Sequence, residues 1–329
     1  MKAITFQQFG SSTVLQTTDV KKPTPEAHQV LIRVEYTSIN PVDWKIREGY
    51  LSRMIPHSFP VIPGWDVAGT IEAIGSDVAD FAPGDRVFAY ARKAVVSGGT
   101  YAEYVTVAKD ALARIPASIR SSDAASIPLV GLTAWQALHD VGRLDASDTV
   151  LVSAGAGGVG SFAIQLARHA GARVVTTASS RNHGYVMELG ADAVVDYNAE
   201  DAIEQLRAAA PDGYSLILDA AGGTALEQAW QVIRRGGRLV SIVSTPDADR
   251  ARAAGIQGDF HFVSPNGRQL ARLGELVASG RVMIPALSIR NIREAANAQD
   301  DNQGRHVRGK VVLKVDFTEQ DRHRGAATL

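Results

Sequence analysis

A glycine-rich segment in the middle of the chain has the residue types and spacing of a phosphate-binding loop. Gly155, Gly157 and Gly160 fit the pattern G-x-G-x-x-G, and with Ala154 as the first residue the segment also fits A-x-x-G-x-x-G. Glycine lets the backbone approach a pyrophosphate closely, because a side chain would hold it away. A helix that starts at such a loop supplies free N–H donors and the positive end of its dipole.

The context of this loop favours dinucleotide binding over a plain tight turn. The loop lies between an expected strand at 149–152 and an expected helix at 159–170. A second apolar strand follows about 20 residues on, as the binding mechanism requires. We therefore expect these residues to surround the pyrophosphate: Gly155, Ala156, Gly157, Gly158, Val159 and Gly160.

The segment after the second strand of this unit indicates which dinucleotide binds. Folds that bind NAD usually place Asp or Glu there, where it bonds the ribose 2′-hydroxyl. Here the strand at 173–177 is followed by Ala178 and then by Ser179, Ser180 and Arg181, with no acid. Two hydroxyls and a guanidinium suit a 2′-phosphate, so we predict NADPH; the alternative is a solvated polar turn. Tyr197, after the third strand, is expected to reach the same phosphate.

The composition excludes several kinds of chemistry. The chain has 329 residues and no cysteine, which removes disulfides, iron–sulfur clusters, thiolate nucleophiles and Cys-based zinc sites. The eight histidines form no obvious ligand cluster along the sequence. We therefore expect no metal centre.

The charge and hydropathy pattern argues against nucleic-acid and membrane partners. Lys and Arg number 34 and Asp and Glu number 35, so no basic excess is available for phosphate backbones or anionic lipids. No apolar run approaches the ~20 residues needed to span a bilayer. Residues 1–10 have no signal-peptide pattern, so the expected location is cytoplasmic, and residues 320–329 look like a solvated tail.

Two textures divide the chain. Residues 1–120 contain short β-like runs broken by Pro and Gly, typical of a mostly antiparallel β domain: 30–36, 67–74, 86–89 and 101–107. From about residue 122, apolar strands alternate with helices, which indicates βαβ units and a parallel sheet. The expected strands are 150–153, 173–177, 193–196, 215–219 and 238–243, and the expected helices include 159–170, 181–189 and 225–233.

The last part of the chain is expected to return to the first domain. It holds one helix at 267–279 and two strand-like runs at 286–289 and 310–315. The predicted division is therefore 1–122 for the first part of the β domain, 123–264 for the dinucleotide-binding domain and 265–329 for the return. The fold class is α/β, with the parallel-sheet domain inserted into the β domain.

Several further motifs occur in a fixed order along nearly the whole chain. They are Asn40-Pro41-Val42-Asp43, Pro63-Gly64-Trp65-Asp66-Val67-Ala68-Gly69, Gly84-Asp85-Arg86-Val87, Gly99-Thr100-Tyr101-Ala102-Glu103-Tyr104, Gly131-Leu132-Thr133-Ala134-Trp135, Asp219-Ala220-Ala221-Gly222-Gly223 and Gly309-Lys310-Val311-Val312-Leu313. With the glycine loop, they resemble the medium-chain dehydrogenase/reductase superfamily, and within it the zinc-independent quinone oxidoreductases and enone reductases. The resemblance implies a GroES-like β domain built from both chain ends and a Rossmann domain between them.

The departures from the zinc-dependent branch constrain the chemistry. That branch places a ligand Cys where Asn40 stands, a ligand His where Trp65 stands and a further Cys near Val130. A zinc ion would stabilise the alkoxide charge formed when an isolated ketone is reduced. Without zinc the acceptor should already be electrophilic, which favours quinones and α,β-unsaturated carbonyls.

The resemblance also implies roles for single residues. Asn40 is placed beside the nicotinamide and Tyr50 near the substrate, as candidate catalytic residues; the alternatives are an Asn-Pro turn and an aromatic that covers core. The cofactor residues implied in addition are Thr133, Val243, Phe262, Val263 and Arg305. Their alternatives are a hydroxyl bonded to its own helix, simple core packing and a solvated loop cation.

Two other functional hypotheses stay open at this point. An enoyl or alkenal reductase of a biosynthetic pathway would share every motif above. A low-turnover NADPH-binding protein, acting as a sensor or structural protein, is a different class. Relatives of this family commonly pair through an edge strand of the Rossmann domain, so a homodimer is expected from the resemblance.

Overall fold

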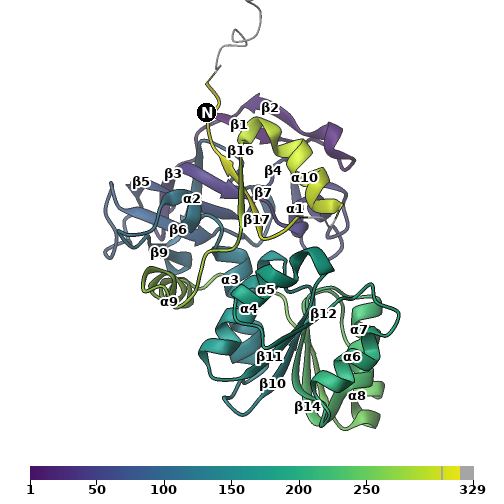
Figure 1. The fold of residues 1–329 in the computed structure, drawn as a ribbon. Helices are drawn as coiled ribbons and strands as arrows, with labels where there is room; N and C mark the ends of the chain where they lie inside the picture. Colours follow the sequence, from purple (N-terminus) through teal and green to yellow (C-terminus); the bar gives the residue numbers. More distant parts are fainter. Residues whose placement is uncertain (305–306, 319–329) are drawn as a thin grey trace, which may run out of the picture.

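Two large sheets, joined by helices and by one hydrophobic core, make up the protein (Figure 1). The computed structural model describes residues 1–304 and 307–318. The predicted class, α/β with a mostly antiparallel domain and a parallel-sheet domain, is confirmed. The predictions for Arg305 and for the tail at 320–329 lie outside the described residues.

The first large sheet has seven strands. Its order is β16-β17-β3-β5-β6-β9, and β8 also pairs with β3. Every pair is antiparallel except β16 with β17. The bounds are β3 Gln29–Ser38, β5 Asp66–Ile74, β6 Arg86–Tyr90, β8 Tyr104–Ala108, β9 Leu112–Arg114, β16 Leu287–Asn291 and β17 Lys310–Lys314.

Two small sheets flank the first large sheet. They pair β1 with β2 and β4 with β7, and the bounds are β1 Lys2–Thr5, β2 Gln16–Asp19, β4 His57–Ile62 and β7 Val96–Gly98. The N-terminal segment explains why β8 begins at Tyr104 and not at Tyr101 as predicted. Ala102 bridges to Ala3, and the N–H of Glu103 donates to the carbonyl of Lys2 at 3.1 Å, so these residues pair with β1 instead.

The second large sheet is parallel throughout and has the order β12-β11-β10-β13-β14-β15. The strand bounds are β10 Thr149–Val152, β11 Arg173–Thr177, β12 Ala193–Val195, β13 Tyr214–Asp219, β14 Ile233–Ser241 and β15 Gln257–Phe260. Helices cover both faces, with α4 and α5 on one and α6, α7 and α8 on the other (Figure 1). Their bounds are α4 Gly158–His169, α5 His183–Glu188, α6 Ala202–Ala209, α7 Thr224–Val232 and α8 Ala248–Ala254.

The strand order places a topological switch point between β10 and β13. The chain runs outward from β10 to β12 in one direction and from β13 to β15 in the other. In open parallel sheets ligands bind at the carboxyl ends of the two strands that flank this point. The glycine-rich loop follows β10, so the fold puts it there.

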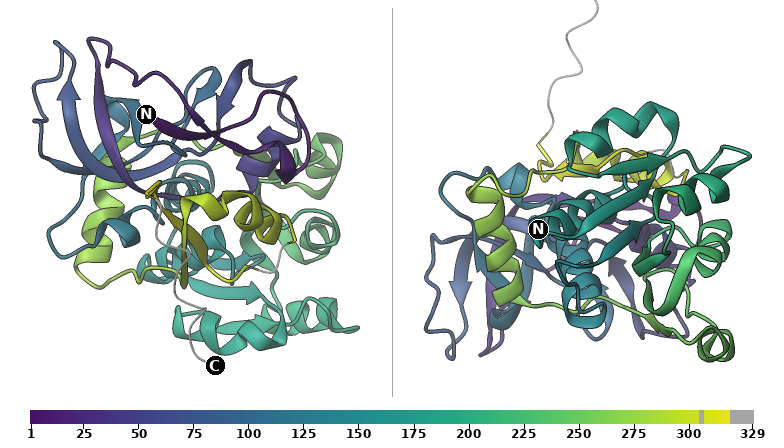
Figure 2. Two further views of the ribbon diagram at one scale, coloured as in Figure 1. Left: turned by 90° about the horizontal axis from the view of Figure 1, so that it is seen from above. Right: turned by 60° about the horizontal axis from the view of Figure 1, so that its bottom comes forward.

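The two ends of the chain meet in the first sheet. Strand β17 pairs with β3, with Val312 opposite Ser38, and the C-terminal strands lie beside the N-terminal ones (Figure 2). The return runs through α9 (Gly267–Ala278), and α10 (Ala295–Gln303) lies between β16 and β17. The domain boundaries at 122 and 264 stay a prediction, which the pairing of β17 with β3 supports.

Helix α3 connects the two sheets. It runs over Pro128–Trp135 and continues as a π-helical turn over Gln136–Val141. Leu132 of α3 lies in the same buried cluster as Trp65, which directly precedes β5 of the first sheet, and Phe162 of α4. The short helices α1 (Pro41–Arg47) and α2 (Ser121–Ala124) complete the fold. Among the described residues no helix has the length and apolar character needed to cross a bilayer.

Candidate cofactor-binding and active site

The glycine-rich loop forms a tight turn that is fixed to the neighbouring strand. The N–H of Gly155 donates to the carbonyl of Thr177 at 2.9 Å, and the N–H of Gly157 donates to the carbonyl of Ala154 at 3.0 Å. Ala154 has a φ of 54°, in the left-handed region that residues with side chains seldom adopt. Strain of this kind persists where the surroundings determine the backbone, and it gathers at ligand-binding sites.

Each glycine of the motif has a different environment. A Cβ on Gly155 would lie 2.1 Å from Oγ1 of Thr176, and a Cβ on Gly160 would lie 2.4 Å from the carbonyl of Ala154. Beside Gly157 the nearest atom is 3.4 Å away, an ordinary contact distance. Packing therefore requires Gly155 and Gly160, whereas a side chain at Gly157 would fill free space next to the helix start. A close approach of the backbone to a pyrophosphate needs free space of this kind.

The start of α4 supplies the donors for such an anion. Gly157 is the N-cap residue of this 12-residue helix, and Gly158 and Val159 form its first turn. The first N–H groups of a helix have no intrahelical acceptor and carry the positive end of the helix dipole. These groups face the loop at the switch point, so the residues fit a bound dinucleotide phosphate.

The predicted 2′-phosphate residues lie at the carboxyl end of β11. Ser179 accepts a hydrogen bond on its hydroxyl from the amide of Asn182 at 3.1 Å, and Ser180 opens a short helical turn. Arg181 is exposed, and within the described residues its guanidinium makes no ion pair or hydrogen bond. Tyr197 is 53% exposed, in the loop after β12. The structure therefore leaves a cation and a phenol hydroxyl available at this corner.

The segment 178–182 contains no acid, but the fold brings an acid to this corner from another part of the chain. Asp196, after β12, accepts the N–H of Ser180 on one carboxylate oxygen at 2.9 Å and the N–H of Asn198 on the other at 2.9 Å. The hydrogen bond from the Asn198 backbone is the main reason that the pKa of Asp196 is lowered. Asp196 fixes the turn through these hydrogen bonds. It lies beside Ser180 because of the register between β11 and β12.

Asn40 lies in a buried polar cluster at the junction of the two sheets. Its amide nitrogen donates to Asp66 at 2.7 Å, and its amide oxygen accepts from Lys310 at 2.7 Å. Asn40 and Asp66 are both 0% exposed. The side chain is thus engaged on both ends, which favours a positioning role over direct contact with substrate.

Lys310 joins this cluster to the glycine loop and was not singled out as a site residue by sequence reasoning. It is 3% exposed and also donates to the carbonyl of Ile39 at 2.8 Å. A Cβ on Gly158 would lie 3.0 Å from Cδ of Lys310, so the aliphatic stem packs on the start of α4. Burial lowers the pKa of Lys310, and Asp66 acts in the opposite direction. The signal in the sequence was the Gly-Lys pair of the last motif.

Asp43 holds the Asn40 turn and has an unusual acidity. Its carboxylate accepts the N–H of Asn40 at 2.8 Å and the hydroxyl of Tyr101 at 3.1 Å through one oxygen, Oδ2. The other oxygen, Oδ1, has no hydrogen-bond partner among the described residues. Burial raises the pKa of Asp43 to about 7, although the Asn40 backbone and Lys310 lower it.

The other candidates at the nicotinamide end occupy varied positions. Thr133 is 3% exposed and its hydroxyl donates to the carbonyl of Leu129 at 2.6 Å, the alternative considered from the sequence. Phe262 and Val263 follow β15 and contact Arg92, which stacks on the ring and donates to the carbonyl of Val263 at 3.0 Å. Tyr50 is 66% exposed, on a turn after α1, with its ring edge-on to Trp44 and outside the buried cluster.

Val243 does not end a strand, as the predicted range 238–243 required. Strand β14 begins at Ile233 and ends at Ser241. The hydroxyl of Ser241 donates to Asp219 at 2.7 Å and accepts the N–H of Val243 at 3.2 Å, which turns the chain out of the sheet. Val243 then lies over Gly222, where an added Cβ would be 2.7 Å from its side chain.

The positions that hold zinc in the zinc-dependent branch converge here but carry other side chains. Asp66 bonds Asn40 through one oxygen and the N–H of Leu129 through the other, at 2.8 Å, and their chain neighbours Trp65 and Val130 are buried in one cluster. An amide, an indole and an aliphatic group do not form a zinc site. Over residues 1–304 and 307–318, no group of three or more His, Asp or Glu side chains is arranged to hold a metal.

A separate cavity lies away from this site. Its walls come from the N-terminal segment, β4, β7 and β8, and it is lined by Met1, Val20, Lys21, Pro23, Pro60, Ile62, Lys93, Ser97, Gly98, Gly99, Tyr104, Val105 and Thr106. None of the predicted site residues lines it. We therefore assign the site from the switch point and not from this cavity.

Comparisons with known proteins agree with the fold and the motifs. Residues 26–117 match the alcohol dehydrogenase GroES-like domain, and residues 189–313 match a domain described as zinc-binding dehydrogenase. A chloroplast envelope quinone oxidoreductase homolog of Arabidopsis thaliana is 31% identical over 95% of this chain and 98% of its own length. An NADPH-dependent alkenal/one oxidoreductase of the same plant is 35% identical, over 95% of this chain and 79% of its own.

Solved structures give the same result. The quinone oxidoreductase of Coxiella burnetii superposes with a TM-score of 0.86 at 34% identity, covering 96% of this chain and 99% of that one. A mycobacterial protein solved with NADPH has a TM-score of 0.84 at 31% identity, covering 96% and 100%. A GroES-like sheet built from both chain ends, with a Rossmann sheet inserted, defines the medium-chain dehydrogenase/reductase class. Within that class, the chain belongs to the quinone oxidoreductase-like family.

Proposed function

We propose that this protein is an NADPH-dependent oxidoreductase that transfers a hydride to a quinone or an α,β-unsaturated carbonyl without zinc. The observation that carries the proposal is the glycine loop at the switch point. The space beside Gly157 is free, whereas packed neighbours leave no room for a side chain at Gly155 or Gly160. The relatives named as quinone oxidoreductase and as NADPH-dependent alkenal/one oxidoreductase support it.

The proposed adenosine side of the cofactor site follows the sequence prediction. The six residues of the loop would surround the pyrophosphate: Gly155, Ala156, Gly157, Gly158, Val159 and Gly160. Ser179, Ser180, Arg181 and Tyr197 would bind the 2′-phosphate. The unpaired guanidinium of Arg181 supports this, because a planar fork of donors matches a phosphate well. The role of Arg305 stays a prediction.

The nicotinamide side is proposed to lie between the buried Asn40 cluster and the segment after β15. When bound, NADPH supplies the hydride. The chain aligns the reactants and excludes water, with Phe262 and Val263 offering backbone groups. We assign Asn40 a positioning role, because Asp66 and Lys310 hold both ends of its amide. Thr133 and Val243 are kept as neighbours of the nicotinamide, and Tyr50 as a residue at the substrate entrance.

The absence of a ligand set at the zinc positions restricts the proposed acceptors. Asn40, Trp65 and Val130 cannot bind a zinc ion, so these positions hold no Lewis acid that would stabilise alkoxide charge. The reaction therefore depends on an acceptor that delocalises the charge itself. Conjugated carbonyls and quinones do this. An isolated ketone does not.

A matched pair of acceptors tests this restriction. NADPH oxidation is followed with 2-cyclohexen-1-one and with cyclohexanone at equal concentrations. We expect turnover with the enone and none above background with the saturated ketone. Comparable rates with the two would contradict the restriction to conjugated acceptors. The ratio of 1,4-benzoquinone to enone rates then separates a quinone reductase from a biosynthetic enoyl or alkenal reductase.

Three further properties stay predictions. The first is a homodimer formed through an edge strand of the Rossmann sheet, where β15 is one edge. The second is a cytoplasmic location, whereas two of the relatives are named for the chloroplast. The third is the domain division at residues 122 and 264. Light scattering on the purified protein measures the mass in solution and tests the first.

A further inference from the structure

Tyr90, the last residue of β6, has a buried hydroxyl that lacks a well-formed hydrogen bond. The side chain is 0% exposed, and its oxygen forms no hydrogen bond of ordinary length and angle among the described residues, although the Arg92 side chain lies near enough to interact with it. The other two fully buried tyrosines are satisfied, since Tyr101 donates to Asp43 at 3.1 Å and Tyr214 donates to the carbonyl of Leu206 at 2.8 Å. An unpaired buried hydroxyl is unfavourable, and phenylalanine at this position would remove it. Such a group in a native fold calls for a ligand or another role.

Tyr90 lies at the junction where the proposed nicotinamide site is placed. It is the strand partner of Asp66, which holds Asn40, and its ring meets Trp65 edge-on at a centre distance of 5.9 Å. Trp65 occupies one of the positions that bind zinc in the zinc-dependent branch. The Tyr90 side chain therefore lies in the part of the fold where that branch binds the zinc ion that polarises the substrate oxygen.

Arg92 brings a second donor to the same place. It follows β6 by two residues and reaches across to the segment after β15, where one N–H donates to the carbonyl of Val263 at 3.0 Å. Its guanidinium carbon lies 4.7 Å from the centre of the Phe262 ring. A guanidinium has five N–H donors, so this contact leaves others for a ligand. The same contacts fix the orientation of the group.

The acid–base state of Tyr90 suits a hydrogen-bond donor. Burial raises its pKa above the ordinary value, and Arg92 opposes this effect by lowering it. The net shift is upward, so the hydroxyl keeps its proton throughout the physiological pH range. A charged partner nearby and a retained proton are the two properties required to stabilise negative charge on an oxygen.

We propose that Tyr90 and Arg92 bind the carbonyl oxygen of the acceptor and that the Tyr90 hydroxyl is the main donor to it. The inference rests on the proposed function. The hydride adds to the electrophilic carbon, and the π electrons of the conjugated system move onto the oxygen. The acceptor gains the two electrons of the hydride from bound NADPH and becomes an enolate, which in the case of a quinone tautomerises to the hydroquinone anion. Tyr90 donates a hydrogen bond to that oxygen and keeps its proton, while solvent provides the proton that completes the product.

The test compares one chemical change at two buried tyrosines. Tyr90→Phe removes the unpartnered hydroxyl, and Tyr214→Phe removes a satisfied one on the far side of the Rossmann sheet. For Tyr90→Phe we expect kcat/KM for the acceptor to fall by about 10- to 100-fold, as for loss of one donor to a charged oxygen, with an equal or higher melting temperature. For Tyr214→Phe we expect a lower melting temperature and kcat/KM within twofold of the parent.

A second measurement does not depend on turnover. The 4-nitrophenolate anion carries its charge on an oxygen attached to a ring, and its absorbance band shifts when that oxygen accepts a hydrogen bond. Titrated with the parent protein, 4-nitrophenol should show a shifted band, and with Tyr90→Phe the shift should be lost. Equal spectra for the two proteins, or unchanged kcat/KM with a higher melting temperature in Tyr90→Phe, would overturn the inference.

The design separates this inference from the proposed function. A parent protein that reduces no acceptor refutes the proposed function, and the 4-nitrophenol spectra then decide on Tyr90 alone. If Tyr90→Phe does not fold, Arg92→Lys replaces it. That variant keeps the charge but loses the fork of donors, so we expect the KM for the acceptor to rise by about tenfold. An unchanged KM in Arg92→Lys would overturn the inference.

Discussion

Asp43 is a buried carboxyl whose pKa is raised to about 7 by burial, against an ordinary value of 3.8. The groups that face it are Tyr101, Lys310, Asp66 and the N–H of Asn40. Because the folded protein binds this proton more tightly than the unfolded chain, the contribution to stability is fully present below pH 3.8 and is lost as the pH rises through about 7.

The variant Asp43→Asn tests that sign. It keeps a side-chain oxygen for the N–H of Asn40 but does not titrate. We expect the free energy of unfolding of the parent, relative to the variant, to fall between pH 5 and pH 8, measured by urea denaturation at each pH. Parallel stability curves for the two proteins would show that Asp43 titrates normally.

Arg181 is the residue on which the preference for NADPH should depend. Its exposed guanidinium has no partner within the described residues, so a 2′-phosphate gains charge-assisted hydrogen bonds there. We expect Arg181→Ala to lower the ratio of NADPH to NADH affinity by about 10- to 100-fold, in line with hydrogen bonds to charged groups. Fluorescence titration with each cofactor measures it.

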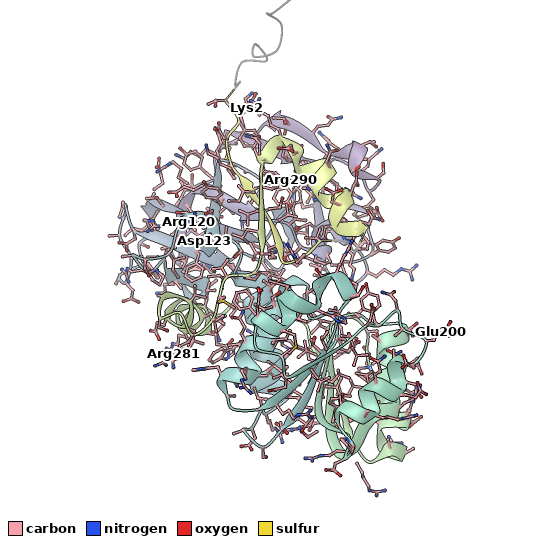
Figure 3. The ribbon with its side chains drawn as sticks, in the orientation of Figure 1. Lys2, Arg120, Asp123, Glu200, Arg281 and Arg290 are labelled. Atoms are coloured by element: carbon pink, nitrogen blue, oxygen red, sulfur yellow. The ribbon has the colours of Figure 1, made fainter. Side chains whose placement is uncertain are left out.

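Arg281 provides the matched control for that prediction. It is also an exposed arginine, after α9, and Figure 3 shows it on the opposite side of the molecule from Glu200, which follows Tyr197 in the loop after β12. Arg281→Ala should leave the cofactor ratio unchanged. Equal ratios in both variants and the parent would contradict the role of Arg181.

Some site residues were readable from the sequence and others were not. The glycine motif and Arg181 are local signals, because their chemistry depends on neighbours in the chain. Tyr90, Lys310 and Asp196 depend on strand pairing: Tyr90 faces Asp66, and Asp196 reaches Ser180 only through the register of β11 and β12. For Asn40, the family resemblance indicated the place but not its burial against Asp66 and Lys310.

At the scale of the element, the turn between β10 and α4 makes a prediction that separates folding from binding. Gly157 has an ordinary φ of -80° and space for a methyl group, whereas a Cβ at Gly155 would lie 2.1 Å from Thr176. We expect Gly157→Ala to fold normally and to bind NADPH at least about tenfold more weakly, a loss of about 1.4 kcal/mol. Fluorescence titration measures this.

Gly155→Ala is the paired variant. Overpacking of a buried site typically costs about 1–3 kcal/mol, so its melting temperature should fall. If Gly157→Ala binds NADPH as the parent does, the free space beside this residue is not the pyrophosphate site.

The elements themselves were largely predictable, and the misplaced boundaries have local causes. The alternation of apolar runs and helical runs indicated the parallel sheet, because buried parallel strands read as continuous apolar segments. The predicted strand at 101–107 starts at Tyr104, since the residues before it pair with the N-terminal segment. Ser241 ends β14 through side-chain hydrogen bonds that no periodicity reveals.

At the scale of the whole molecule, Lys310 connects the last strand to the first motif and to the Rossmann helix. It lies 3.5 Å from Asp66, and both are buried. Removing one partner of a buried ion pair leaves an uncompensated charge, which typically costs about 3–5 kcal/mol. We expect Lys310→Met to lose stability of this order in urea denaturation.

Lys314 lies on the same strand and is the control, because its side chain is 54% exposed. Lys314→Met should change stability by less than about 0.5 kcal/mol, as usual for surface substitutions. Similar losses in the two variants would mean that the pair of Lys310 with Asp66 does not hold the junction together.

The most direct test of the account is the consumption of NADPH, with NADH in parallel, against 1,4-benzoquinone and a simple alkenal. We predict turnover with NADPH on at least one of these acceptors and a rate with NADH lower by about tenfold or more, since only NADPH gains the phosphate contacts at Arg181. Binding of NADPH without reduction of either acceptor would contradict the assignment as a reductase and favour a sensor or structural protein.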